Sequence, residues 1–231
     1  MNLVLPAAAT VVVPVRGCDA HFAVRRIYCV GKNYVAHQIE MGGSGREAPF
    51  FFTKPADAVL AVAEGAVGRM PYPSLTADLH HEVELVVAIG QGGRNISAAH
   101  ALEHVWGYAV GLDMTRRDLQ TQAKTAGRPW DIAKGFDHSA PIGALSPAAD
   151  VAEMASAAIS LTVDGQPRQA SSIAKMIWNV AEIIEHLSAA WALAPGDLIY
   201  TGTPEGVAAV VAGNRLDARI EGLAPLSIDI V

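Results

Sequence analysis

Residues 80–85 read His80-His81-Glu82-Val83-Glu84-Leu85 and begin a long apolar run. Side chains alternate between the two faces of a β-strand, so Glu82 and Glu84 project from one face while Val83 and Leu85 point to the other. Two adjacent carboxylates raise each other's pKa and destabilise a sheet unless a cation lies between them. The stretch therefore predicts either a cation site on a strand or an exposed glutamate pair at a sheet edge.

A third carboxylate, Asp113, follows a second apolar run at residues 105–112. Three hard oxygen donors without a nearby cysteine are the ligands that magnesium, manganese or calcium prefer over zinc. His80 shares the face of Glu82 and could complete a histidine–carboxylate site for iron or manganese. We prefer His80 as a strand-start residue that contacts the ligands.

Bulk composition indicates one globular core and a second copy of the chain as partner. The 231 residues are 51% hydrophobic and 17% charged, which excludes disorder and leaves apolar surface for another subunit to cover. We therefore expect a homo-oligomer. The formal net charge of -6 opposes binding to nucleic acid or to an anionic membrane, because phosphate binding needs clustered Lys and Arg.

The N-terminal residues and the cysteines favour a cytoplasmic protein. Residues 3–15 are apolar, but Pro6 and Pro14 interrupt them and no basic segment precedes them, so a β-strand or a loose arm is expected in place of a signal peptide. No segment reaches the roughly 20 uninterrupted apolar residues that span a bilayer. Cys18 and Cys29 cannot form a disulfide framework, which fits a reducing compartment.

Apolar periodicity predicts more strands than helices and no alternation of strand and helix. The expected fold class is α+β, mostly β, with a few surface helices. Asp164-Gly165 is a strong signal for a hairpin turn. Strands are expected at 26–30, 50–53, 81–89, 106–114, 159–163, 197–201, 216–220 and 226–231, and helices at 34–41, 97–105, 116–126 and 179–192.

His37 and Glu40 are three residues apart on the expected helix 34–41, so they share a face. A carboxylate that orients an imidazole makes it a better base, whereas the alternative is an ordinary solvated pair. The pair directly precedes Gly42-Gly43-Ser44-Gly45, where a lid could carry it over a metal centre.

Basic residues near the carboxylates would matter for substrate binding, because three carboxylates around one divalent ion leave the site with a net charge near -1. An anionic substrate could approach such a site only with local cations, and Lys134 and Arg117 could supply them. Lys134 could equally be a surface lysine.

The run His100-Ala101-Leu102-Glu103-His104 matches an inverted zinc-protease pattern, which we reject because no distal glutamate in a helical setting follows. Residues 201–206 end a strand in a Gly-Pro turn whose backbone N–H groups and threonine hydroxyls could bind a carboxylate, although a plain turn is the preferred interpretation of this segment taken alone.

Several segments taken in order resemble the fumarylacetoacetate hydrolase family, from about Arg26 to Val231. Within the family, the likeness is to the small single-domain acylpyruvate hydrolases, and the 25 residues before the matched region leave no room for the N-terminal β-domain of the larger members. The matching segments are Gly31-Lys32-Asn33-Tyr34-Val35-Ala36-His37, Phe52-Thr53-Lys54-Pro55, His80 to Leu85, Leu112-Asp113-Met114-Thr115-Arg116-Arg117-Asp118, Ala133-Lys134-Gly135-Phe136-Asp137 and Tyr200 to Val207.

The resemblance implies an N-terminal arm or strand at 1–25 and one catalytic domain at 26–231, in which mixed sheets roll into a barrel-like fold. A homodimer is implied as well. It also implies Mg²⁺ or Mn²⁺ held by Glu82, Glu84 and Asp113. On the same basis, His37 and Glu40 would be the catalytic dyad that activates water. The residues that would line the substrate pocket are Arg117, Gln120, Lys134 and Thr203, and Lys134 would also stabilise the enolate as a catalytic residue.

The implied activity is hydrolysis of a carbon–carbon bond in an acylpyruvate, a 2-oxo acid substrate. Fumarylpyruvate, cleaved to fumarate and pyruvate as in gentisate catabolism of aromatic compounds, is the expected substrate. Decarboxylation of oxaloacetate or a broader acylpyruvase activity is the alternative, since both proceed through the same pyruvate enolate. A metal-binding protein without turnover is disfavoured, because a pure binder needs no oriented base such as His37.

Overall fold

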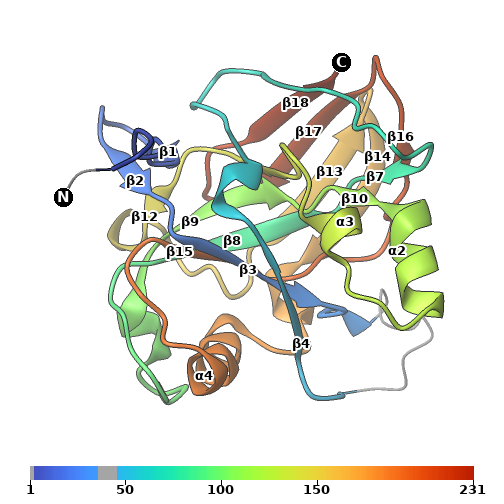
Figure 1. Ribbon diagram of the computed structural model, residues 1–231. Helices are drawn as coiled ribbons and strands as arrows, with labels where there is room; N and C mark the ends of the chain where they lie inside the picture. Colours follow the sequence, from blue (N-terminus) through green and yellow to red (C-terminus); the bar gives the residue numbers. More distant parts are fainter. Residues whose placement is uncertain (1–2, 36–45) are drawn as a thin grey trace.

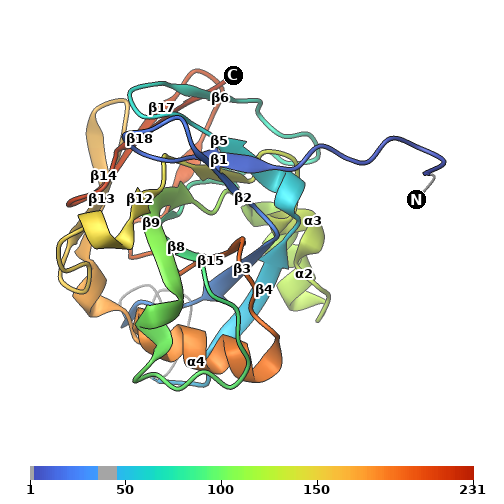
Figure 2. The ribbon, with the colours of Figure 1, turned by 90° about the vertical axis from the view of Figure 1, so that its left-hand side faces the viewer.

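The computed structural model describes residues 3–35 and 46–231 of the chain. Its largest element is a mixed eight-stranded sheet, which Figure 2 shows curled around the interior of the molecule. The strand β12 (Ser146–Pro147) pairs with β9 beside the main order. Along the sheet the strands are β4 (Phe50–Lys54), β3 (Arg26–Gly31), β15 (Asp197–Tyr200), β8 (Val83–Ile89), β9 (Val105–Leu112), β11 (Ala140–Ile142) and β5 (Val59–Ala61).

A second sheet of five strands packs across the first, at the upper right of Figure 1. Its strands are, in order, β14 (Gln166–Ser172), β13 (Ala158–Val163), β17 (Arg215–Ile220), β18 (Leu226–Ile230) and β6 (Gly68–Met70). The predicted turn between β13 and β14 is confirmed, because Val163 pairs with Gln166 across Asp164 and Gly165. Both turn residues have positive φ, as a type I′ hairpin requires.

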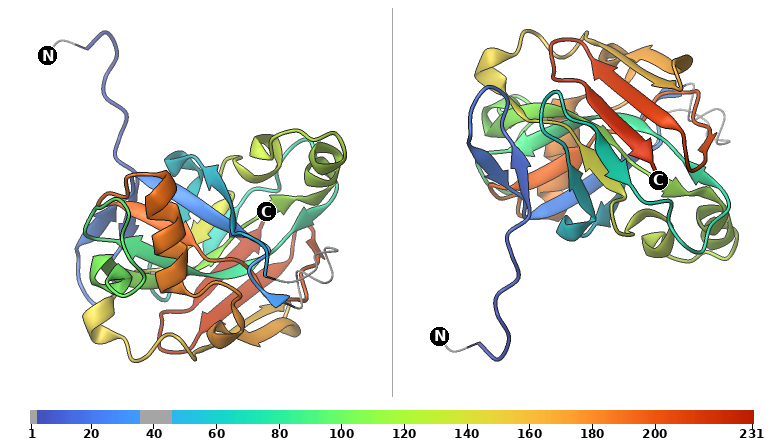
Figure 3. Two further views of the ribbon diagram at one scale, coloured as in Figure 1. Left: turned by 90° about the horizontal axis from the view of Figure 1, so that it is seen from below. Right: turned by 90° about the horizontal axis from the view of Figure 1, so that it is seen from above.

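Two small sheets complete the β structure of the described residues. One joins β10 (Thr115–Arg116), β7 (Leu79–His80) and β16 (Ala209–Val210). The other pairs β1 (Val12–Pro14) with β2 (His21–Ala23). The residues before β1 extend away from the body (Figure 3), while Val13 within β1 is fully buried against the main sheet. The described residues before β3 thus form an extended segment followed by the strand pair β1–β2.

Helices lie at the periphery, as expected for a mostly β fold. α4 (Val180–Ala190) lies at the bottom of Figure 1, and α2 (Arg117–Thr125) with α3 (Asp131–Lys134) lies at the right. Asn179 and Glu182 form a capping box that begins α4, and the buried face of this helix includes Ile183, Ile184 and Leu187. Short 3₁₀ turns are η1 (Ala56–Ala58), η2 (Ala101–His104), η3 (Ala148–Asp150) and η4 (Ile173–Lys175).

The helix predicted at 97–105 is wrong: only the 3₁₀ turn η2 forms there. The His104 carbonyl accepts hydrogen bonds from the backbone N–H groups of Gly90 and Gln91, at 2.8 and 3.2 Å. β9 then begins at Val105 and pairs with β8. β9 thus takes the last residue of the expected helix, the Val105 N–H bonds to the Leu102 carbonyl three residues back, and the local helical pattern is overridden.

Two apolar clusters occupy the two faces of the main sheet. Val83, Leu85, Val87 and Ile89 belong to the first cluster, between the two large sheets, whereas Val86 and Ala88 belong to the second. Every residue of β8 is buried, as expected for a central strand covered on both faces. An exposed glutamate pair at a sheet edge is thereby excluded.

No helix within the described ranges combines the length and hydrophobicity needed to cross a bilayer.

Candidate metal centre and active site

Glu82, Glu84 and Asp113 meet at the junction of β8 and β9. One oxygen of each carboxylate lies within 4.8 Å of the other two, and the residues are 5%, 2% and 1% exposed. We call these residues the acidic triad. They are also the one group of three potential metal ligands found within residues 3–35 and 46–231.

Strand register explains why the triad converges. Val83 pairs with Leu112 on one side of the junction, and His80 pairs with Thr115 on the other. The same antiparallel register therefore runs across the break between β7 and β8 and places Asp113 opposite Glu82. The backbone N–H of Asp113 donates to the Glu82 carbonyl at 2.9 Å. The strand predicted at 81–89 is thus interrupted at 81–82 but remains in register.

Glu84 projects from the centre of the main sheet toward the loop after β15. The Gly202 N–H donates to Glu84 Oε2 at 2.8 Å, and the Thr201 and Thr203 hydroxyls donate to backbone carbonyls of β8 at 2.9 Å. Gly202 has φ +97°, and a Cβ there would lie 2.6 Å from the Asn33 Cβ, so only glycine fits. The turn at 201–206, which the sequence alone led us to interpret as a plain turn, therefore binds a carboxylate of the chain itself through the Gly202 N–H.

Three basic side chains face the acidic triad. Lys134, at the end of α3, places its Nζ 2.8 Å from Glu82 Oε2 and 2.6 Å from Asp113 Oδ2. Arg117, at the start of α2, donates to Glu82 Oε1 and Gln120 Oε1. Lys54 Nζ lies 2.8 Å from Asp113 Oδ1. Three cations therefore balance three carboxylates, and Lys134 is a buried residue, not a surface lysine.

Burial raises the pKa of Glu84 well above its usual range, and the charges of Asp113 and Glu82 raise it further. Burial acts to lower the pKa of Lys134, but Asp113 and Glu82 outweigh that effect and the net pKa is raised. Lys134 is therefore held as an ammonium group. Glu84 is therefore a carboxylate whose ionised form another positive charge would stabilise.

The donor set fits a hard divalent cation. Three buried carboxylates offer oxygen ligands from two adjacent strand ends, with no thiolate among them. A cation bound there would favour the ionised form of Glu84, which its surroundings otherwise disfavour. The residues that could hold such an ion are thus Glu82, Glu84 and Asp113.

Lys54 is a residue of the site to which the sequence pattern assigned no role. Its side chain is fully buried, and its Nζ donates to the carbonyls of Lys134, Met114 and Ser139, the last two at 3.3 and 3.0 Å. It therefore fixes the backbone that carries both Asp113 and Lys134. Lys54 belongs to the segment Phe52-Thr53-Lys54-Pro55, which resembles the family, and this is the sequence signal that could have identified it.

Gln169 and Asn33 also went unpredicted. Gln169, on β14, donates to Thr203 Oγ1 at 2.8 Å and accepts from the Val83 N–H at 3.1 Å. The Asn33 amide donates to the carbonyls of Thr201 and Trp178 at 2.8 and 2.9 Å. Both residues hold the 201–203 loop against β8. Nothing in the local sequence of Gln169 indicates contacts so far along the chain.

The remaining histidine candidates do not join the acidic triad. His80 Nε2 lies 2.8 Å from Asp78, and its Nδ1 accepts from Arg117 Nε at 3.4 Å, so it supports Arg117 as a neighbour of the ligands. His100 pairs with Glu103, and His104 contacts the Gln91 carbonyl. Rejection of the zinc-protease pattern agrees with this geometry. His37 and Glu40 lie outside the described residues, so the predicted dyad and its lid remain predictions.

A cavity of about 30 Å³ opens onto the acidic triad. It is small because the Lys134 and Arg117 side chains reach in to pair with the carboxylates. The predicted substrate-pocket residues all line it together with the acidic triad. They are Arg117, Gln120, Lys134 and Thr203.

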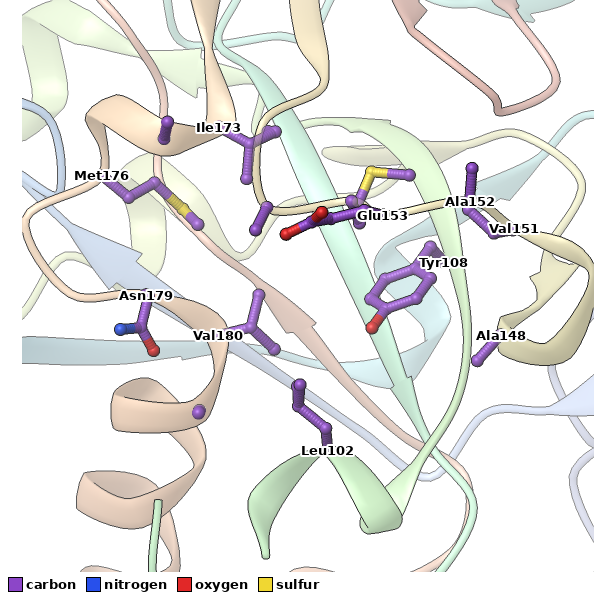
Figure 4. Close-up of a pocket in the computed structure, with 14 residues that line it drawn as sticks. Leu102, Tyr108, Ala148, Val151, Ala152, Glu153, Ile173, Met176, Asn179 and Val180 are labelled. Atoms are coloured by element: carbon purple, nitrogen blue, oxygen red, sulfur yellow. The ribbon is translucent and has the colours of Figure 1, made fainter. Parts of the chain in front are cut away.

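A separate cavity of about 520 Å³ lies between η2, η4 and the start of α4 (Figure 4). It shares no lining residue with the triad cavity, and Glu153 is its one charged side chain. Its walls are mostly apolar, with the Tyr108 hydroxyl pointing inward in Figure 4. It has no converging ionisable groups, so the smaller cavity is the candidate active site.

The fold and the site define a known class of protein. A family model described as fumarylacetoacetate (FAA) hydrolase C-terminal matches residues 26–231. The chain therefore belongs to the fumarylacetoacetate hydrolase family, which confirms the resemblance and the expected fold.

The chain is also similar over most of its length to individual members of the family. The crystal structure of fumarylpyruvate hydrolase from Pseudomonas aeruginosa in complex with Mn²⁺ and pyruvate is 55% identical, with a TM-score of 0.98, over 100% of this chain and 99% of that one. A fumarylpyruvate hydrolase from a Ralstonia species is 47% identical over 184 residues, 80% of this chain and 93% of that protein. A mitochondrial oxaloacetate tautomerase from Arabidopsis thaliana is 41% identical over 205 residues, 89% of this chain and 90% of that protein.

Proposed function

We propose that this chain is a divalent-cation-dependent hydrolase that cleaves fumarylpyruvate to fumarate and pyruvate, as in gentisate catabolism. The family and the relatives support an enzyme that hydrolyses carbon–carbon bonds. The observation that carries the proposal is a buried acidic triad opposed by three cations, in a chain 55% identical to an enzyme solved with Mn²⁺ and pyruvate.

Glu82, Glu84 and Asp113 are proposed to hold Mg²⁺ or Mn²⁺. The bound ion would supply Lewis-acid stabilisation for negative charge on the pyruvoyl half of the substrate. Lys54 would keep Asp113 oriented as a ligand, since it fixes that carboxylate and the neighbouring backbone.

Charge balance explains why an anionic substrate would bind. Lys54, Lys134 and Arg117 already neutralise the acidic triad, so the full charge of a divalent ion would remain to attract a carboxylate. This balance is more favourable than the -1 expected for three carboxylates and one ion. A 2-oxo acid presents a carboxylate and a ketone oxygen side by side, which suits such a site.

Hydrolysis then needs a base for water and a sink for the electron pair of the broken bond. His37, oriented by Glu40, is proposed to remove a proton from water, and the resulting hydroxide attacks the distal acyl carbonyl. The carbon–carbon bond breaks, its electron pair passes to the methylene carbon as a pyruvate enolate, and protonation of that carbon yields pyruvate. The acyl half leaves as a carboxylic acid.

Lys134 is proposed as the residue that faces the developing enolate charge. Its ammonium group is buried, stays protonated and lines the cavity. Stabilisation of charge where it develops is usually the largest catalytic contribution. Arg117 would bind the pyruvoyl carboxylate, and Gln120 and Thr203 would orient the substrate from the same cavity wall.

Oxaloacetate chemistry is the second candidate. Loss of CO₂ from oxaloacetate forms the same pyruvate enolate, and enolisation needs the same charge stabilisation without an attacking water. The oxaloacetate tautomerase among the relatives favours keeping this alternative. A cytoplasmic homodimer stays our prediction for the assembly, and light scattering on the purified protein tests its size.

A parallel product assay tests the function. Protein stripped with a chelator and reloaded with Mn²⁺ or Mg²⁺ is given fumarylpyruvate, acetylpyruvate and oxaloacetate, and kcat/KM is compared for each. We expect metal-dependent cleavage with fumarylpyruvate as best substrate. A higher kcat/KM for oxaloacetate, with CO₂ or enol as product, would assign the chain to the second candidate instead.

A further inference from the structure

A second cavity of about 230 Å³ adjoins the triad cavity. Gly31, Lys32 and Trp130 line both cavities, so the two spaces share these residues as a common wall. At about 30 Å³ per water volume, the second cavity has room for roughly eight waters, which is ample for a four-carbon acyl group. We call this space the outer cavity.

The outer cavity carries two lysines without partners. Lys32 follows β3 and Lys124 lies in the last turn of α2. Within the described ranges, neither side chain forms an ion pair or a hydrogen bond, although both line the same space. Glu47 is the one acidic residue among the lining residues, so the balance of charge favours an anion.

Lys32 also adopts an unusual backbone conformation, with φ +57°. A non-glycine residue in the left-handed region is unfavourable and is often found at ligand sites. Lys32, which has this conformation, lies where the two cavities meet.

Two indole rings form walls of the outer cavity. Trp130 contacts Phe50 edge-on with ring centroids 5.0 Å apart, and Trp178 contacts His186 in the same way at 4.7 Å. Arg46 stacks on Trp178, a wall of the outer cavity, and pairs with Glu182 at 2.6 Å. Its charge is therefore already neutralised, which leaves Lys32 and Lys124.

We infer that the outer cavity binds the acyl half of the substrate and that Lys124, with Lys32, selects acyl groups that end in a carboxylate. The inference rests on the proposed function, because it takes the triad cavity as the pyruvoyl end. The aromatic walls suit a flat, conjugated chain, and the lysines suit its terminal charge. Residues of α2 and of the end of β3 would then make the enzyme selective for substrates whose acyl half is an unsaturated diacid.

The test is the ratio of kcat/KM for fumarylpyruvate to that for acetylpyruvate, whose acyl group has no terminal charge. Lys124→Gln removes one exposed charge and leaves the core intact. We expect this ratio to fall about tenfold, with cleavage of acetylpyruvate retained, because one charge-assisted hydrogen bond is lost. Lys32→Gln should lower the ratio in the same direction.

Arg128→Gln is the matched control. It removes an exposed positive charge just beyond α2, but Arg128 does not line the outer cavity. The ratio should stay at the wild-type value. A ratio in Lys124→Gln within twofold of wild type, or an equal fall in Arg128→Gln, would overturn the inference.

Failure of the proposed function looks different. If the wild-type protein cleaves neither acylpyruvate, calorimetric binding of fumarate to the Mn²⁺-loaded protein still tests the outer cavity. Fumarate binding that weakens about tenfold in Lys124→Gln supports the inference, and binding unchanged by that substitution rejects it.

Discussion

Glu84→Gln separates the role of the acidic triad in metal binding from any role in folding. The substitution preserves the shape of the side chain and an oxygen that can accept the Gly202 N–H, but it removes the negative charge. At an effective dielectric constant of 20, two charges 4.8 Å apart repel by about 3 kcal/mol. Because Glu82 and Asp113 oppose its ionisation in this way, a neutral residue at position 84 should not destabilise the metal-free protein.

Metal binding should respond strongly. Mn²⁺ at a hundred times its dissociation constant stabilises a protein by about 2.7 kcal/mol. For a chain of this length that raises Tm by roughly 5–10 °C. Loss of one of three ligands should weaken binding by about a hundredfold or more, since even residues that only support ligands are worth 10–100-fold. The same Mn²⁺ concentration would then stabilise Glu84→Gln by only about 0.4 kcal/mol.

Differential scanning calorimetry measures both quantities, with each protein scanned in chelator and in Mn²⁺ at neutral pH. Glu153→Gln is the control, because Glu153 is the carboxylate of the other cavity and is remote from the acidic triad. A Mn²⁺-dependent rise in Tm as large in Glu84→Gln as in wild type would refute the ligand assignment. A fall of more than about 5 °C in chelator would refute the claim that Glu84 contributes no folding energy through its charge.

Three further results are expected. His37→Ala should keep the Mn²⁺-dependent rise in Tm but lose about 10² to 10⁴ in kcat, the usual worth of a positioned base; loss of the Tm rise would make His37 a ligand. Asn33→Ala should lower the free energy of unfolding by about 3 kcal/mol in urea titrations, because it leaves buried backbone groups of Trp178 and Thr201 unpaired. Burial lowers the pKa of His81 to about 4, despite a hydrogen bond to Gln169, so its contribution to stability is complete above pH 6.5 and is lost as pH falls toward 4. That contribution amounts to about 3 kcal/mol. His81→Asn should therefore make the urea midpoint less dependent on pH between pH 6.5 and 4. A pH dependence equal to that of the wild type would show that His81 is not buried as a neutral ring.

The strands that we predicted and the carboxylates of the acidic triad were predictable because each depends on residues close together in the sequence. The period-two pattern of β8 placed Glu82 and Glu84 on one face, and the end of β9 supplied Asp113. The turn at Asp164 and Gly165 follows from the backbone preferences of those two residues alone. These predictions needed no knowledge of distant contacts.

Prediction failed where distant groups compete for the same backbone. Residues 97–105 have a helical pattern, yet β9 begins at Val105 and pairs with β8, so only a 3₁₀ turn forms before it. Gln169 and Lys54 reach the site across 86 and 80 residues of chain, so no local periodicity reveals them. The hydrogen bonds of Gln169 exist only once the two large sheets have packed together, and those of Lys54 exist only once β4 lies against α3 and the turn before β11.

Sequence by itself determined the kind of chemistry: three carboxylates, a lysine and an arginine in ordered motifs of one family. Tertiary structure decided their charge balance, because only folding brings Lys54, Lys134 and Arg117 within ion-pair distance of the acidic triad. It also decided that Lys32 and Lys124 share one cavity while Arg46 is paired elsewhere. Coulomb interactions depend on separation in space and on burial, and neither quantity is encoded by spacing along the chain.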